Sequence, residues 1–228
     1  MVLSAAVLPR PPRTLSRRER LIRFAAKPLV FALCLLPLAW VVERALTDQL
    51  GANPIEAATR FLGEWGLRFL LLSLAVTPLR QLLQWPTVMR FRRMIGLFGF
   101  AYVGLHLTSY VALDQFFDLA AIWADIVKRT YITLGMAAFL LLLPLAVTST
   151  SGWVKRLGAA RWQRLHRLVY PAAVLAVAHY YMLVKADIRE PLVYAAILAA
   201  LLGWRVWRRW RPSPQLRPRR QAMGTVAS

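Results

Sequence analysis

Histidine is the residue type in this chain best suited to chemistry, and all three copies lie within or beside long apolar segments. His106 lies within FGFAYVGLHLTSYVAL, while His166 and His179 lie within RWQRLHRLVYPAAVLAVAHYYMLVK. An ionisable side chain inside such a segment is costly in lipid and usually faces protein, water or a ligand. Neutral imidazole is also a ligand of haem iron. The histidines therefore indicate a cofactor held inside a membrane.

His106 and His179 are expected to lie at the same depth. His106 is about 12 residues, or about 18 Å of helix, beyond Met94, where its apolar segment begins, and His179 is about 14 residues, or about 21 Å, into its own segment. Two imidazoles at one level on neighbouring helices can bind one haem iron from both sides. The small residues before His106 are expected to leave room for the flat ring. They are Gly96, Gly99, Ala101 and Gly104.

Two alternatives for this pair stay open. The histidines could be hydrogen-bonded across helices as a packing contact. They could also line a proton or metal path, although no intramembrane carboxylate accompanies them.

His166 differs because it lies at the other end of its segment, between Arg164 and Arg167. It precedes His179 by about 13 residues, which is about 20 Å along a helix and a rotation of roughly 140°. The two side chains therefore point in different directions unless Pro171 bends the helix. A second haem, a quinone or flavin contact, and a plain interfacial histidine all remain possible.

The partner of a haem at His166 is not evident, because Arg92 and Arg93 occupy the matching level of the His106 segment. Basic residues near this end are expected mainly as topology signals. Some could hold haem propionates or a flavin phosphate, since arginine pairs well with such groups. These basic residues are Arg92, Arg93, Lys155, Arg156, Arg161 and Arg164.

Long apolar blocks dominate the chain of 228 residues, which is 58% hydrophobic with a mean hydropathy of +0.47. Blocks of about 18–20 residues are long enough to cross about 30 Å of hydrocarbon. We therefore predict an all-α integral membrane protein, a bundle of six transmembrane helices over residues 28–210 with haem between helices 3 and 5. The blocks are 28–46, 66–84, 94–113, 131–149, 166–185 and 190–207.

Charge predicts the topology. With the N-terminus in the cytoplasm, most of the 30 basic residues fall in cytoplasmic segments, where Glu19 is the single acid. The other acids fall on the opposite side, so the chain is expected to be N-in and C-in. Residues 1–27 and 211–228 are expected to be basic cytoplasmic tails. Residues 114–130 are expected to form a short interfacial helix, or a docking surface for an extracytoplasmic partner.

Several classes of function are disfavoured. The net charge is +20, and the basic residues flank the apolar blocks, which favours contact with anionic membrane lipid over nucleic acid. The single cysteine, Cys34, permits no intrachain disulfide. The sequence contains no phosphate loop, dinucleotide fingerprint, zinc-protease motif or nucleophile elbow.

Four stretches resemble the MsrQ family (formerly YedZ), the haem-binding membrane subunits of bacterial MsrPQ methionine sulfoxide reductase systems, within the ferric-reductase-like transmembrane group. The resemblance covers about residues 28–205. One departure is Thr130, where the family usually has proline. The stretches are NPIEAATRFLGEWGLRFLLLSLAVTPLR, RRMIGLFGFAYVGLHLTSY, DIVKRTYITLG and LAVTSTSGWVKRLGAARWQRLHRLVYPAAVLAVAHYY.

This resemblance implies a multi-pass protein of the bacterial inner membrane. It would take electrons from the quinone pool or a cytosolic flavin reductase and pass them through haem b to a periplasmic molybdopterin-containing subunit in a heterodimer. It also implies FMN as a further cofactor. By position, His106 and His179 match the ligands of the main haem, His166 matches the third functional histidine, and Arg92 matches a basic residue near a haem.

Alternatives to this function stay open at the sequence level. A stand-alone haem-containing ferric or quinone reductase would need no periplasmic partner. A haem-free membrane transporter or scaffold belongs to a different class. The chain shows no pocket for a sulfoxide substrate in its sequence, so that reduction is expected in the partner.

Overall fold

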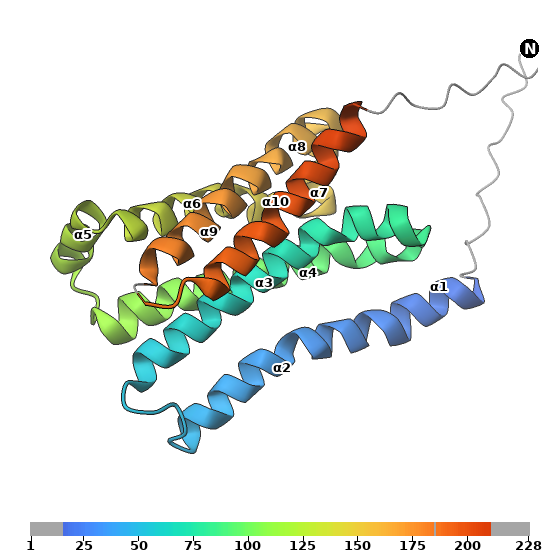
Figure 1. Cartoon of the computed structure of the whole chain (residues 1–228). Helices are drawn as coiled ribbons and strands as arrows, with labels where there is room; N and C mark the ends of the chain where they lie inside the picture. Colours follow the sequence, from blue (N-terminus) through green and yellow to red (C-terminus); the bar gives the residue numbers. More distant parts are fainter. Residues whose placement is uncertain (1–15, 185, 211–228) are drawn as a thin grey trace, which may run out of the picture.

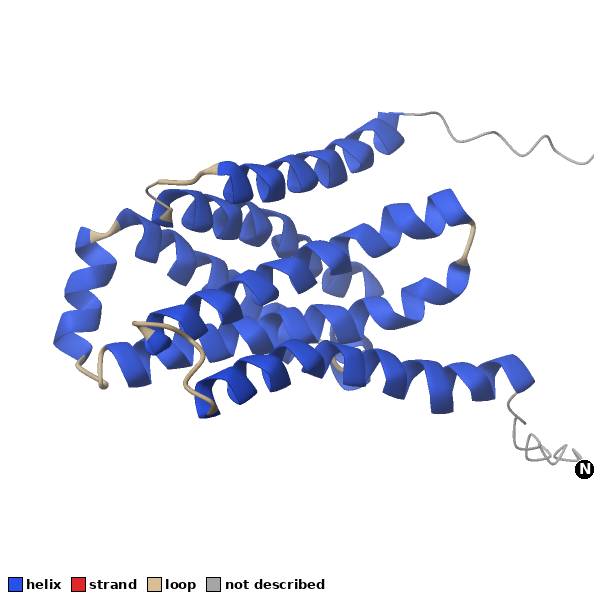
Figure 2. Cartoon of the chain, turned by 60° about the horizontal axis from the view of Figure 1, so that its bottom comes forward, coloured by secondary structure: helices blue, strands red, loops and turns tan. Residues whose placement is uncertain are grey.

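The computed structural model describes residues 16–184 and 186–210, and every regular element in these ranges is helical (Figure 2). Within them, five helical segments are long and apolar enough to cross a membrane. These segments are Glu19–Leu46, Pro54–Leu83, Pro86–Asp114, Thr130–Val147 and Arg189–Trp210. The all-helical membrane class is therefore confirmed.

The first membrane helix starts before its apolar block. The short helix α1 (Arg17–Leu21) and the π-helical turn η1 (Ile22–Ala26) lead directly into α2 (Lys27–Leu46). The described end of the expected tail is thus helical from Arg17, while its first 15 residues and the C-terminal tail from residue 211 lie outside the described part. Helical backbone bonds extend into this basic stretch without requiring apolar side chains.

Two long antiparallel helices, α3 (Pro54–Leu83) and α4 (Met89–Ser109), form the most closely packed pair. The side chain of Asn53 caps α3 by accepting a hydrogen bond from the backbone N–H of Glu56. A Cβ built on Gly99 would lie 3.2 Å from the backbone nitrogen of Leu70, so glycine permits close approach of the two backbones.

The second half of the chain supplies the other wall of the bundle, in which α6 packs mainly on α9 and α10 packs on α3 and α9 (Figure 1). The helix α4 continues into the π-helical turn η3 (Tyr110–Asp114) before this half begins. Its helices are α5 (Leu119–Lys128), α6 (Thr130–Val147), α7 (Ser151–Leu157), α8 (Ala159–Leu165), α9 (Val169–Leu183) and α10 (Arg189–Trp210).

The expected fifth membrane helix is divided. A 3-10 turn, η4 (His166–Leu168), separates α8 from α9, and α9 has 15 residues. By itself an α-helix of that length spans about 22 Å, and the region of α8, η4 and α9 is not among the five long apolar segments. Pro171 lies in the first turn of α9, where its missing N–H costs no helical hydrogen bond.

The bundle has two distinct ends in Figure 1. At the α5 end lie α5 and the connections from α2 to α3 and from α9 to α10. At the α7 end lie α7, α8, the start of α1 and the end of α10. The segments that charge assigns to the cytoplasm therefore gather at one end, which is consistent with the predicted topology.

The predicted short helix near residues 114–130 is present as α5. Asp118 caps it by accepting hydrogen bonds from the backbone N–H groups of Ala120 and Ala121. Its apolar face is exposed, with Leu119 at 75% and Trp123 at 68% of full accessibility. Whether lipid or a partner covers that face stays a prediction.

Candidate functional site

His106 on α4 and His179 on α9 face each other across the interior of the bundle. Their ring centroids lie 6.2 Å apart with an angle of 74° between the ring planes. The two residues are 73 positions apart in the chain, and both are half-buried. The pairing expected from equal helical depth therefore occurs in the fold.

A backbone carbonyl fixes the orientation of each imidazole. Nδ1 of His106 lies 2.8 Å from the carbonyl oxygen of Thr59, and Nδ1 of His179 lies 2.6 Å from that of Tyr131. A carbonyl can only accept, so Nδ1 donates in both rings and the lone pair of a neutral imidazole is on Nε2. This is the arrangement found in metal-ligating histidines.

A glycine stands directly behind each ring. A Cβ added to Gly63 would lie 2.9 Å from Nδ1 of His106, and one added to Gly135 would lie 2.9 Å from Nδ1 of His179. Real Cβ atoms essentially never make such short contacts. The two sites therefore need glycine on the opposing helix, α3 for His106 and α6 for His179.

The small residues before His106 do not provide this space, which corrects the expectation from the sequence. Gly96 packs near Ser73 on α3, and Gly99 packs against the α3 backbone. A Cβ on Gly104 would meet nothing within 4 Å. None of these glycines, nor Ala101, lines the cavity beside the histidines. No local sequence motif marks Gly63 and Gly135, so their role becomes visible only from their contacts in the folded structure.

The histidines line a cavity of about 330 Å³ whose walls come from α3, α4, α6 and α9. Apolar side chains surround its deep part, and charged or hydroxyl side chains line it toward the α5 end. The deep residues include Leu67, Leu70, Val103, Phe139, Leu142 and Ala176. The residues toward the α5 end include Asn53, Glu56, Arg60, Tyr110, Asp114, Arg129 and Tyr131.

The residues present fit a haem. Two imidazoles bound to one metal through bonds of about 2.0 Å place their ring centroids about 6 Å apart, since each centroid lies roughly 1 Å behind its nitrogen. The observed separation is 6.2 Å. A metal ion bound by protein side chains alone usually needs at least three of them, and this site offers two imidazoles. In the described ranges no group of three or more His, Cys, Asp or Glu side chains could hold one, whereas a porphyrin supplies its own four nitrogens.

His166 lies apart from this pair, in η4 toward the α7 end. Its ring stacks on Trp162, with centroids 3.8 Å apart, and Nδ1 donates to the Trp162 carbonyl oxygen at 3.1 Å. Nε2 is buried and makes no hydrogen bond. The Leu145 carbonyl lies near the ring and accepts a hydrogen bond from Ser149 Oγ at 2.7 Å. The structure brings no second histidine to His166.

Arg92 on α4 is half-buried and lies near His166, Tyr170 and Arg205. Arg205 on α10 is held by the backbone carbonyls of Leu201 and Leu74. No ion pair of Arg92 or Arg205 with an acid occurs among the described residues. Arginine, tyrosine and an unpartnered imidazole nitrogen thus share one region at the α7 end.

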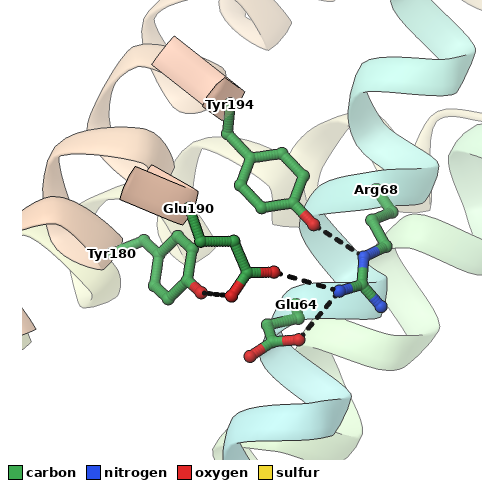
Figure 3. A network of polar contacts seen from close by, with 5 residues as sticks. All are labelled: Glu64, Arg68, Tyr180, Glu190 and Tyr194. Atoms are coloured by element: carbon green, nitrogen blue, oxygen red, sulfur yellow. Dashed lines mark hydrogen bonds and ion pairs between the residues drawn. The ribbon is translucent and has the colours of Figure 1, made fainter. Parts of the chain in front are cut away.

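A polar network ties α3 to α9 and α10 beside the histidine cavity (Figure 3). Arg68 donates to Tyr194 Oη at 2.7 Å and to a Glu64 carboxylate oxygen at 2.9 Å, and it lies 3.4 Å from Glu190. Tyr180, next to His179 in the chain, donates to Glu190 at 2.9 Å. The sequence does not reveal this network, because its two parts, Glu64–Arg68 and Tyr180–Tyr194, are more than a hundred residues apart.

Comparison with known proteins places this chain among redox membrane proteins. Residues 62–177 match the family described as ferric reductase like transmembrane component. This match covers both His106 and His166 and stops two residues before His179. The class defined by the helical bundle is therefore that of ferric-reductase-like transmembrane proteins.

Similar curated proteins carry a more specific name, protein-methionine-sulfoxide reductase heme-binding subunit MsrQ. The protein from Rhodospirillum rubrum is 65% identical over 192 residues, covering 84% of this chain and 90% of the relative. That from Caulobacter vibrioides is 54% identical over 207 residues, covering 91% and 99%. That from Polaromonas naphthalenivorans is 53% identical and covers 85% and 90%. The chain belongs to the MsrQ family, and no solved structure matches it.

Proposed function

We propose that this chain is the haem-carrying membrane subunit of a protein-methionine-sulfoxide reductase system and that it conducts electrons across the bacterial inner membrane. The observation that carries the proposal is the His106–His179 pair, with ring centroids 6.2 Å apart and both Nδ1 atoms bound to backbone carbonyls. The name of the curated relatives supports haem as the group held there.

His106 and His179 are the residues that would hold a haem b in this proposal, each through its Nε2 atom. When bound, the haem supplies one-electron redox chemistry. The carbonyls of Thr59 and Tyr131 hold the ring orientation and make Nε2 the free nitrogen. The surrounding apolar side chains keep water from the deep end of the cavity, which helps to set the redox potential.

His166 and Arg92 are proposed to form the entry site for electrons at the cytoplasmic end. The buried Nε2 of His166 lacks a hydrogen-bond partner, and Arg92 provides a positive charge without an acid among the described residues. Such groups suit a second haem, a quinone oxygen or the phosphate of FMN. The donor in this proposal is the quinone pool or a cytosolic flavin reductase.

The substrate chemistry is assigned to a periplasmic molybdopterin-containing subunit that pairs with this chain. The name of the relatives, as heme-binding subunits of a protein-methionine-sulfoxide reductase, supports a separate catalytic subunit, and its cofactor and location belong to the proposal. In this view the α5 end faces the periplasm, and the basic α7 end faces the cytoplasm.

Spectroscopy of the purified chain tests the proposal. The protein in detergent should yield haem b in the pyridine haemochrome assay, and the ferric form should give the electron paramagnetic resonance of a low-spin, bis-histidine haem. Chemically reduced protein should then be reoxidised by a molybdopterin sulfoxide reductase subunit in the presence of methionine sulfoxide. A folded but colourless protein would contradict the proposal. A coloured protein that reduces quinone or ferric iron, but never the partner, would instead favour a stand-alone reductase.

A further inference from the structure

The histidine cavity is strongly polarised along its length. On α3, α4 and α6, the lining residues change from apolar to charged or hydroxyl-bearing toward the α5 end. On α3 the change runs from Leu70 to Arg60, and on α4 it runs from Val103 to Tyr110. A carboxylate is very costly in an apolar site without a partner. A planar ligand with one charged edge is therefore expected to bind in one orientation, with that edge facing the α5 end.

Two arginines line this charged part of the cavity, Arg60 on α3 and Arg129 at the junction of α5 and α6. They are the only arginine or lysine side chains among the cavity residues in the described ranges. Arg60 directly follows Thr59, whose carbonyl orients His106, and Arg129 lies two residues before Tyr131, whose carbonyl orients His179. Each arginine is thus attached to the segment that positions one histidine.

Each arginine is paired with one nearby acid and has further N–H groups that can bind another anion. Arg60 pairs with Glu56 one turn earlier on α3, and Arg129 pairs with Asp125 at 3.1 Å and approaches Tyr131 Oη at 3.3 Å. Their side chains are 52% and 54% exposed. The Glu56 side chain is 49% exposed, so its ion pair contributes little stability, whereas Asp125 is 16% exposed and also accepts from Tyr110. A carboxylate placed between the two arginines can therefore displace Glu56 and bind the N–H groups of Arg129 that Asp125 does not use.

We propose that Arg60 and Arg129 form the binding site for the two propionate groups of the haem held by His106 and His179. The inference rests on the proposed function and deepens it, because it fixes which edge of the haem faces the α5 end. It also separates this site from the basic residues of the α7 end, which lie beyond the apolar part of the cavity. Arginine is suited to the role because its planar guanidinium binds carboxylates through two hydrogen bonds.

The first test needs no variant. Apoprotein from haem-deficient cells is reconstituted either with haem or with haem dimethyl ester, in which both propionates are esterified. The ester should bind about tenfold more weakly, as expected from the loss of about 1.4 kcal/mol of charged contacts. Equal binding of the two compounds would overturn the inference.

The second test uses Arg60→Gln, Arg129→Gln and the double variant, with Arg189→Gln as the control. Arg189 lies at the same end of the bundle, has a side chain that is 93% exposed, and is not among the cavity residues. Each cavity variant should speed haem transfer to apomyoglobin about three- to tenfold. The double variant should no longer distinguish haem from its dimethyl ester. The control should behave as the original chain does.

The outcomes separate the inference from the proposed function. A chain without bound haem would refute the proposed function. A chain with low-spin haem in which the arginine variants match Arg189→Gln would refute the propionate site alone. If a variant does not fold, the ester comparison on the unaltered chain still decides the question.

Discussion

The two histidine regions of this bundle differ in how completely the fold prepares them. At His106 and His179, two rings from different helices face each other, each with Nδ1 on a carbonyl and each backed by a glycine. At His166, one ring packs on Trp162 and leaves its Nε2 buried without a partner. The first region is a preformed two-ligand site, and the second offers a single ligand.

The difference follows from helix geometry. His106 and His179 lie within regular helices, α4 and α9, whose rise places them at one level. His166 lies in the 3-10 turn between α8 and α9, at the level of arginines. A cofactor held by two histidines should stay bound when a neighbouring side chain is removed. At His166, binding of a cofactor would depend on further groups from the surrounding residues.

Removing a ligand of the preformed pair should have the largest effect. In His106→Gly or His179→Gly, haem affinity should fall by more than the 10–100-fold typical of losing a group that only orients a ligand, and the low-spin signal should disappear. Added imidazole should restore part of that signal by entering the vacated space. His166→Ala is the matched comparison and should keep the low-spin signal of the pair. Equal losses in all three variants would break the distinction between the two regions.

Crowding the rings should have a smaller effect on the same site. In Gly63→Ala or Gly135→Ala, the new Cβ lies 2.9 Å from an imidazole Nδ1, so the ring must move away from its carbonyl. Haem affinity should then fall by about tenfold, the lower limit for losing a contact that orients a ligand.

The control for crowding is Gly104→Ala, whose Cβ meets nothing within 4 Å. Alanine is favoured over glycine in a helix by about 1 kcal/mol, so this variant should keep its haem and be at least as stable as the original chain. Haem content and the temperature of unfolding measure both effects. A loss of haem in Gly104→Ala that equals the loss in Gly63→Ala would show that the contact with the ring is not the cause.

Much of the fold could be predicted because apolar block length and charge are properties of the local sequence. The equal depth of His106 and His179 followed from their distances to the starts of their helices, and the 6.2 Å separation agrees with it. The division of the fifth helix was less accessible. Pro171 indicated a disturbance, but the 3-10 turn lies five to three residues earlier, at His166–Leu168.

The parts of the site that sequence reasoning missed depend on contacts between distant segments. Gly63 and Gly135 lie on α3 and α6, far in sequence from the histidines. Thr59 and Tyr131 contribute backbone carbonyls, which every residue type has, so their identity does not mark them as site residues. The glycines that did stand out, Gly96 and Gly99, serve helix packing. Small residues close to a histidine in sequence are therefore a poor guide here, because the space for each imidazole ring is provided by a glycine on the opposing helix.

Breaking the network beside the preformed site should have a moderate effect on stability. Arg68→Gln removes the cation between Glu64 and Glu190 and the hydrogen bond to Tyr194. Losing one partner of a buried polar contact costs about 1–3 kcal/mol, and the partial exposure of Glu190 favours the low end. The unfolding temperature should fall, and binding at the His106–His179 pair should weaken because α9 and α10 lose their tie to α3. Arg189→Gln, an exposed arginine at the same end, should change neither quantity.

The smallest expected effect concerns the single-ligand region. Trp162→Phe keeps an aromatic ring beside His166 but removes the hydrogen bond from Trp162 Nε1 to the Thr148 carbonyl, 2.9 Å long. The free energy of unfolding should fall by about 0.5–1.5 kcal/mol, while Trp210→Phe, at a position 81% exposed, should leave it unchanged. The low-spin signal of the His106–His179 pair should be the same in both variants, because Trp162 does not line that cavity. A changed signal in Trp162→Phe alone would mean that the two regions are coupled through α9. The inner histidine would then tune the outer haem, and the two sites could no longer be treated as independent.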